Sequence, residues 1–204
     1  GETGGYYEDY ADTPAAKLVR ALTEGFVYQG EPSPHRGGEK RGEGSAHLPP
    51  TAFVTFLQNH DQIGNRALGE RLTLLVDQQP LRTMMAVLLL SPSIPMLYMG
   101  EEWGAKTPFC YFCDFHGDLA EAVREGRRRE FAGFPAFSSP EMRERIPDPN
   151  AEETFALSRL DWDALAWEEH EDWLAQTGVL LRLRHGAVVP RLKGGVAHAD
   201  DRSW

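Results

Sequence analysis

The sequence lacks an apolar run long enough to span a membrane, and it has few cysteines and little positive charge. Its longest apolar block, Met84–Leu90, is far shorter than the roughly 18 residues that suggest a transmembrane helix. An excess of acidic residues gives a formal net charge of -10. This charge argues against a nucleic-acid or anionic-membrane partner, because both select basic surfaces. It suits a soluble protein with a neutral substrate.

The two cysteines, Cys110 and Cys113, have the spacing C-x-x-C. A structural zinc site needs four ligands, and no second cysteine pair exists. A redox-active pair would normally lie at a helix N-terminus, whereas here Pro108 and Phe109 precede the first cysteine. We therefore expect two reduced thiols in an apolar loop, no metal site and no cofactor.

The chain begins at Gly1 without an initiator methionine, a basic leader or an apolar signal core, and it stops at Trp204 in a polar segment. We expect it to be a fragment of a longer polypeptide. With 204 residues, 41% of them hydrophobic, it can form one globular domain, or one domain and the start of another.

Two apolar runs each end in a polar cluster, and a helical segment separates them. Phe53–Gln58 precedes Asn-His-Asp-Gln at 59–62, and Ile94–Met99 precedes Gly-Glu-Glu-Trp at 100–103. Short apolar runs bounded by turn residues predict strands that are buried on both faces of a parallel sheet. Leu81–Leu90 is predicted to be the helix between them. The sequence therefore predicts an α/β fold with one right-handed βαβ unit.

The segment before these runs is predicted to contain a helix and a long loop. The helix covers 12–25, with Thr13 as N-cap, Gly25 at its end and a buried stripe. The stripe consists of Leu18, Val19 and Leu22. Glu31–Pro50 is rich in glycine and proline and has no hydrophobic period, so we expect a loop. It is either solvated or able to touch a ligand through Tyr28, His35 and Arg36.

Two further helices are predicted after the second apolar run. Asp118 and Glu121 resemble a capping box that opens a helix through about Phe131, with a basic run on its solvated face. Glu168–His185 reads as an amphipathic helix, and Gly186 is its predicted C-cap. Trp173, Leu180, Leu181 and Arg184 share one face of this helix.

The polar clusters indicate carbohydrate chemistry. Asp61 and the pair Glu101/Glu102 follow neighbouring strands, and two carboxylates in one cleft can divide acid and base work, as in glycoside hydrolysis. Neutral hydrogen-bonding groups suited to sugar hydroxyls surround Asp61, and Trp103 and Tyr98 offer flat faces. The neutral groups are Asn59, His60, Gln62 and Asn65.

Of three alternatives to a carbohydrate site, two remain open at this point. His60 and Asp61 could be metal ligands, but no third ligand is evident. A serine nucleophile would need a motif such as Gly-x-Ser-x-Gly, which does not occur. The polar cluster could also be purely structural.

Phe53–Leu72, a short apolar strand that ends in Asn-His-Asp, resembles the fourth signature region of the α-amylase superfamily of glycoside hydrolases. The stretch Leu57–Leu72, which extends beyond this tripeptide, closely resembles the malto-oligosyltrehalose trehalohydrolases. Three other stretches fit the same family, and the resemblance runs from about Gly4 to about Gly186. These stretches are 24–30, 95–104 and 123–131.

The resemblance implies the C-terminal part of a (β/α)8 TIM barrel. On this mapping the Phe53 strand is the seventh and the Ile94 strand the eighth, each with flanking helices. Residues 1–186 would form a partial catalytic barrel, and 187–204 would begin a truncated C-terminal β domain.

The resemblance also implies an activity: retaining hydrolysis of the α-1,4-glucosidic bond next to the terminal trehalose of maltooligosyl trehalose. Asp61 would be the third catalytic carboxylate, which stabilises the transition state, and His60 would contact the same sugar ring. The acid–base pair proposed above would then not be catalytic. Further substrate-binding residues would be Gln62, Ile63, Gly64, Asn65, Glu102 and Trp103.

An Asp nucleophile and a Glu acid/base would lie outside this sequence, on strands four and five. The expected partners are therefore maltooligosyl trehalose or a related α-glucan and the missing N-terminal part of the same protein. We expect the chain alone to be inactive. The family's substrate is made inside the cell, which implies a cytoplasmic location.

Two alternatives to this function remain. The parent protein could be another superfamily member, such as a glycogen branching enzyme that transfers the glycosyl group to sugar. It could also be a non-catalytic glucan-binding module, if it lacks the upstream Asp and Glu.

Overall fold

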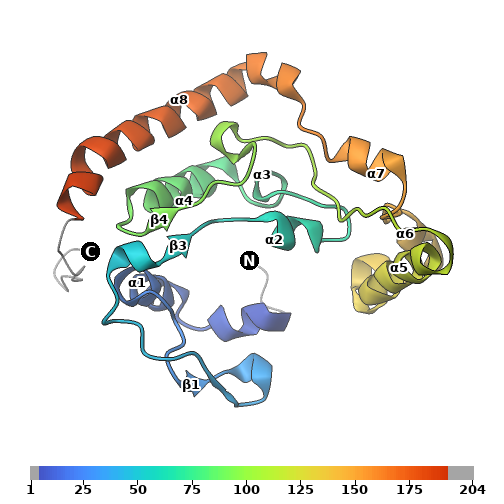
Figure 1. Cartoon of the computed structure of the whole chain (residues 1–204), viewed down its shortest axis with the longest axis horizontal. Coiled ribbons are helices and arrows are strands. Elements are labelled where there is room, and N and C mark those ends of the chain that lie inside the picture. Colours follow the sequence, from blue (N-terminus) through green and yellow to red (C-terminus); the bar gives the residue numbers. More distant parts are fainter. Residues whose placement is uncertain (1–4, 193–204) are drawn as a thin grey trace. The chain divides into compact units, whose positions relative to one another are not determined.

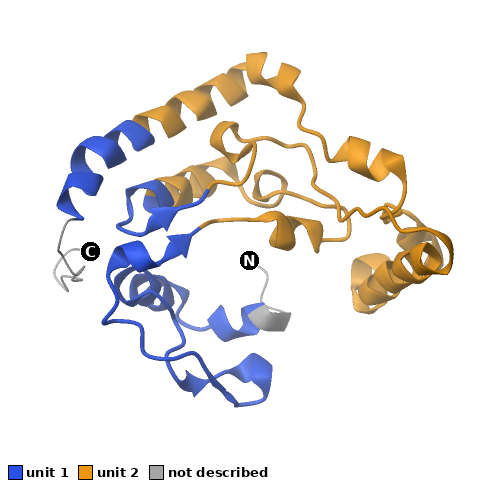
Figure 2. Ribbon diagram, viewed as in Figure 1, with its two compact units in different colours: residues 1–55, 87–96, 180–204 blue, residues 56–86, 97–179 orange. Residues whose placement is uncertain are grey.

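The computed structural model describes residues 5–192, and it divides into two compact units (Figure 2). Within the described residues, the first unit contains 5–55, 87–96 and 180–192, and the second contains 56–86 and 97–179. The fold is mostly helical with small sheets (Figure 1).

The α-helices vary widely in length, and the strands are short. The helices are α1 (Pro14–Glu24), α2 (His60–Gly64), α3 (Leu72–Leu75), α4 (Gln78–Leu90), α5 (Gly117–Glu130), α6 (Pro140–Glu144), α7 (Glu152–Leu157) and α8 (Glu168–Leu183). The strands are β1 (Glu31–Pro32), β2 (Lys40–Arg41), β3 (Val54–Thr55) and β4 (Ile94–Pro95). Among the residues described, no helix has the length and apolar character needed to cross a membrane.

The predicted parallel pair of strands is confirmed, but its length and burial are not. Strand β3 pairs in parallel with β4, and the carbonyl of Phe53 accepts the amide of Ile94 at 2.9 Å. Each strand has only two residues, and the side chains of Val54 and Ile94 are 55% and 46% exposed. The prediction of strands buried on both faces is wrong, because this sheet has only two strands within 5–192.

The helix predicted over 12–25 is confirmed as α1 with both cap positions, but its predicted buried stripe is wrong. Gly25 ends the helix with a φ of 93°, which a residue with a side chain rarely adopts. Thr13 occupies the predicted N-cap position, but it has a φ of 45° and its side chain makes no capping bond. Leu18 and Val19 are exposed and Leu22 is only partly buried.

The segment predicted to be a loop, Glu31–Pro50, contains the antiparallel hairpin of β1 and β2. Asp9 holds the hairpin from its fully buried position, where its carboxylate accepts bonds from the Ser33 hydroxyl and the His35 backbone amide. Arg41 completes this set with a 2.8 Å ion pair to Asp9. The sequence did not predict this ordered hairpin, because Asp9, the residue that holds it, lies far upstream in the sequence.

Two of the predicted helices are confirmed, with corrections at their ends. Helix α5 has His116 at its N-cap without a side-chain bond, so the predicted capping box is wrong. Helix α8 continues through Gly186 in a π-helical turn at Arg184–Val188, so the predicted C-cap is also wrong. Most of the predicted β domain lies outside the described residues, in 193–204, and Val189–Arg191 forms a 3-10 turn.

Candidate functional site

The polar cluster that follows β3 forms the first turn of α2. His60 and Asp61 are its first two residues, and Asn59 is its N-cap. The Asn59 side chain accepts the amide of Gln62 at 2.8 Å, and the Gln62 side chain accepts the amide of Asn59 at 3.2 Å. This capping box satisfies two amides that the helix itself leaves unpaired. The turn is therefore fixed by side chains on both sides of His60 and Asp61.

His60 and Asp61 point into solvent from this turn. Their side chains are 68% and 74% exposed, and Nε2 of His60 lies 3.4 Å from Oδ1 of Asp61. The pair thus presents a carboxylate and an imidazole side by side. The carboxylate can accept hydrogen bonds from sugar hydroxyls, and the imidazole can accept or donate them.

The segment after α2 packs closely against the backbone around Phe109. The amide of Phe109 donates to the carbonyl of Gly69 at 2.9 Å. Gly69 has a φ of 66°, and a Cβ built on it would lie 2.6 Å from the carbonyl carbon of Phe109. Glycine is required here by both the backbone angle and the close approach.

A buried polar centre connects the two predicted polar clusters within the second unit. Gln58 accepts the amide of Leu72 at 3.1 Å, which joins the two ends of the segment that carries Asp61. Arg71 is fully buried and donates to the carbonyls of Met99 and Thr107. The segment that contains α2 is therefore tied to the segment 97–107 by backbone carbonyls.

Glu101 is the acidic member of this polar centre. It is 5% exposed, and its Oε2 accepts the backbone amide of Tyr98 at 2.9 Å. Burial raises the pKa of Glu101 to about 7, although the Tyr98 amide and the charge of Arg71 both lower it. Glu101 is thus held by protein groups and does not face solvent.

The other residues predicted to bind substrate differ in exposure. Asn65 is exposed and Glu102 is partly buried, so both can be reached from solvent. Ile63 and Gly64 are buried. Trp103 is 2% exposed and packs in a cluster with Ala105 and Ala164, which leaves no ring face for a sugar. The Gln62 side chain is engaged in the capping box.

The cysteines and the acidic side chains give no sign of a metal site. Cys110 and Cys113 are free thiols, as predicted. Within residues 5–192, no group of three or more His, Cys, Asp or Glu side chains is placed to hold a metal ion.

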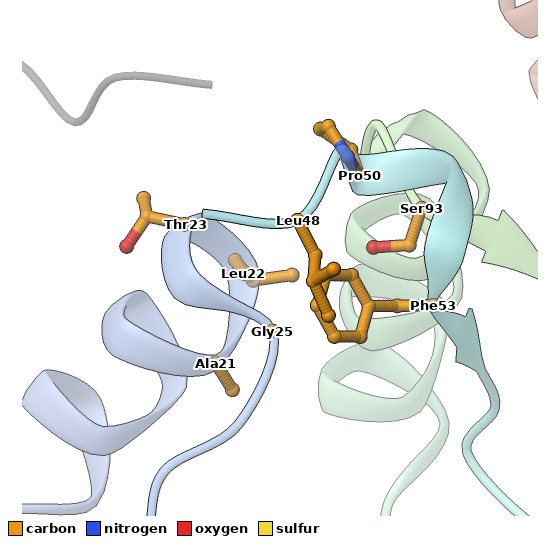
Figure 3. A pocket seen from close by; sticks show the side chains of 8 residues that line it. All are labelled: Ala21, Leu22, Thr23, Gly25, Leu48, Pro50, Phe53 and Ser93. Atoms are coloured by element: carbon orange, nitrogen blue, oxygen red, sulfur yellow. The ribbon is translucent and has the colours of Figure 1, made fainter. Parts of the chain in front are cut away.

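Each of the two units contains a small pocket. The pocket in Figure 3 belongs to the first unit, and its lining is mostly apolar, with the Phe53 ring beside Gly25. The other belongs to the second unit and is lined by Thr73, Lys106, Glu169 and His170 among others. Neither of these two pockets is lined by His60, Asp61 or Glu102.

Two structural supports of the turn were missed in the sequence. Asn59 and Gln62 have the spacing of a capping box, so this signal was available. Arg127 was assigned to a solvated face, yet it is 8% exposed and donates to the carbonyls of Gly64 and Arg66. Nothing in the basic run 127–129 marks the first arginine as the buried one.

The architecture places the chain in a known structural class. It matches part of the crystal structure of a candidate α-amylase from Salmonella typhimurium, with a TM-score of 0.88 and 53% sequence identity. The match covers 96% of this chain and 32% of that one. No family model matches the chain. The fold is therefore that of a part of an α-amylase-like protein.

More particularly, the chain is homologous to malto-oligosyltrehalose trehalohydrolases. It is 43% identical to that of Deinococcus radiodurans over 185 residues, 90% of this chain and 30% of that protein. It is 39% identical to that of Arthrobacter ramosus over 188 residues, and 40% identical to that of Saccharolobus solfataricus over 163. The chain spans about 30% of the length of these curated relatives.

Proposed function

We propose that the chain supplies one wall of the α-glucan site in a retaining glycoside hydrolase. The reaction is hydrolysis of the α-1,4 bond next to the terminal trehalose of maltooligosyl trehalose, which releases trehalose. The proposal is carried by the exposed His60–Asp61 pair on a fixed turn, in a chain homologous to trehalohydrolases. The longer polypeptide would act in the cytoplasm, where its substrate is made.

Asp61 stabilises the transition state in this proposal. Glycoside cleavage passes through an oxocarbenium-like state, and hydrogen bonds to ring hydroxyls that strengthen there supply several kcal/mol. The Asp61 carboxylate is an acceptor for such hydroxyls and carries a charge opposite to that of the developing cation. His60 lies 3.4 Å away and contacts the same ring.

The remaining wall residues have the exposure that sugar contact requires. Asn65 and Glu102 offer an amide and a carboxylate that solvent reaches. Ile63, Gly64 and Trp103 support the wall from the buried side. The nucleophile and the acid/base belong to the rest of the longer polypeptide, whose other elements would complete a (β/α)8 barrel.

A product assay on the longer polypeptide tests this function. With maltooligosyl trehalose as substrate, we expect free trehalose to be released. New α-1,6 branches would identify a branching enzyme, and no product of either kind would favour a non-catalytic module. The 204-residue chain assayed in parallel is expected to release no trehalose.

A further inference from the structure

The C-terminal half of α5 is attached to the turn that carries His60 and Asp61. Phe131, directly after the helix, is 7% exposed and forms an apolar cluster with Ala67 and Ile146. Leu68 packs against the same cluster. The segment that follows α2 therefore rests on the end of α5 through apolar contacts.

Arg127 adds a polar attachment at the same place. Its Nη2 donates to the carbonyl of Gly64, the last residue of α2, and to that of Arg66 at 2.9 Å. Carbonyls at a helix C-terminus lack partners within the helix and carry partial negative charge. A buried guanidinium satisfies them and compensates this charge.

The guanidinium itself is held in place from three sides. It lies 4.8 Å from the ring centroid of Phe131 and 5.5 Å from that of Tyr111. Nη1 forms a 3.0 Å ion pair with Glu130. A planar group with several fixed donors can serve two carbonyls and two rings together, whereas an ammonium group can donate to a carbonyl but lacks the planar, fixed donor geometry.

We propose that Arg127 is a positioning residue that fixes the turn presenting His60 and Asp61 to the glucan. The inference rests on the proposed function of Asp61. The capping box holds the N-terminal side of α2 and Arg127 holds its C-terminal side. Loss of Arg127 releases the C-terminal side of α2, while the apolar cluster around Phe131 still holds the segment that follows it.

The test compares Arg127→Met with Arg129→Met in the longer polypeptide. Methionine keeps most of the length of the side chain and its contact with Phe131, but it removes the donors. Arg129 is exposed on the same helix and serves as the matched control. In Arg127→Met we expect amide exchange of residues 61–69 to accelerate about tenfold or more, with no such change in the control.

Kinetics separate positioning from general stability. Trehalose release by Arg127→Met is expected to lose kcat about tenfold or more with a smaller change in KM, because a misplaced Asp61 weakens the transition state most. Arg127→Lys, which restores one donor group, is expected to recover part of kcat.

Three outcomes would overturn the proposal. Unchanged exchange at 61–69 would show that Arg127 does not hold the turn. Faster exchange with unchanged kcat, or a lysine variant no better than methionine, would show a merely structural role. If the unmodified polypeptide releases no trehalose, the proposed function fails, while the exchange data still decide whether Arg127 holds the turn.

Discussion

The carboxylate of Glu101 accepts the backbone amide of Tyr98 at 2.9 Å while only 5% of the residue is exposed. Burial raises its pKa from the ordinary value of 4.5 to about 7. Between these values the folded state binds more protons at this group than the unfolded state does. The contribution of Glu101 to stability is therefore lost as the pH rises from about 4.5 to about 7.

Glu101→Gln is expected to remove this pH dependence. Glutamine keeps an oxygen acceptor for the Tyr98 amide but cannot ionise. Each unit of pKa shift corresponds to about 1.4 kcal/mol. Between pH 4.5 and 8, the free energy of unfolding should therefore fall by about 3 kcal/mol less in Glu101→Gln than in the unmodified chain. Denaturant unfolding at several pH values measures this. Glu102→Gln, at a partly buried neighbour, is the control, and an equal pH slope in both variants would contradict the account.

Gly69→Ala is expected to destabilise the chain by at least about 2 kcal/mol. The left-handed backbone costs a residue with a side chain about 1–2 kcal/mol, and overpacking adds a similar cost. The added Cβ would meet the Phe109 backbone at 2.6 Å.

Gly126→Ala is the matched control for Gly69→Ala. Gly126 lies inside α5, and nothing lies within 4 Å of a Cβ built there. We expect this variant to gain about 0.5–1 kcal/mol of stability. Thermal unfolding of both variants decides the point, and equal midpoints would show that the close approach to Phe109 is absent.

Arg184→Met is expected to destabilise the first unit strongly. The buried guanidinium of Arg184 donates to the carbonyls of Leu89, Ser91 and Ser93, which link the end of α4 to β4. Each unsatisfied buried carbonyl costs about 1–3 kcal/mol, so a loss of about 3 kcal/mol or more is predicted. Chemical denaturation should show it, and Arg182→Met, at an exposed position of α8, should stay near the unmodified value. A loss of similar size in both variants would contradict this role.

Local patterns predicted the helices and the order of elements well. Turn residues at its ends placed α1, an apolar run placed α4 and an amphipathic pattern placed α8, while the two short apolar runs placed β3 and β4 in one parallel pair. The helices and strands are local features that a single sequence displays directly, and the parallel pairing follows from the order strand, helix, strand.

Burial and long-range contacts were harder to predict. The apolar side chains of Val54 and Ile94 fit a sheet covered on both faces, but the structure leaves both exposed. Trp103 has the residue type of a sugar platform, yet packing against Ala105 and Ala164 buries it. Arg127 and Arg129 are alike in sequence, and only the position of Gly64 across the fold distinguishes them.

The carboxylate of Asp61 is central to the account, and one substitution tests it most directly. In the longer polypeptide, Asp61→Asn should lower kcat/KM for trehalose release from maltooligosyl trehalose by about 10²-fold or more, with unchanged thermal unfolding. Asp114→Asn is the control, because Asp114 is also exposed and lies 3.8 Å from a histidine nitrogen. Activity retained by Asp61→Asn at the level of this control would contradict the account.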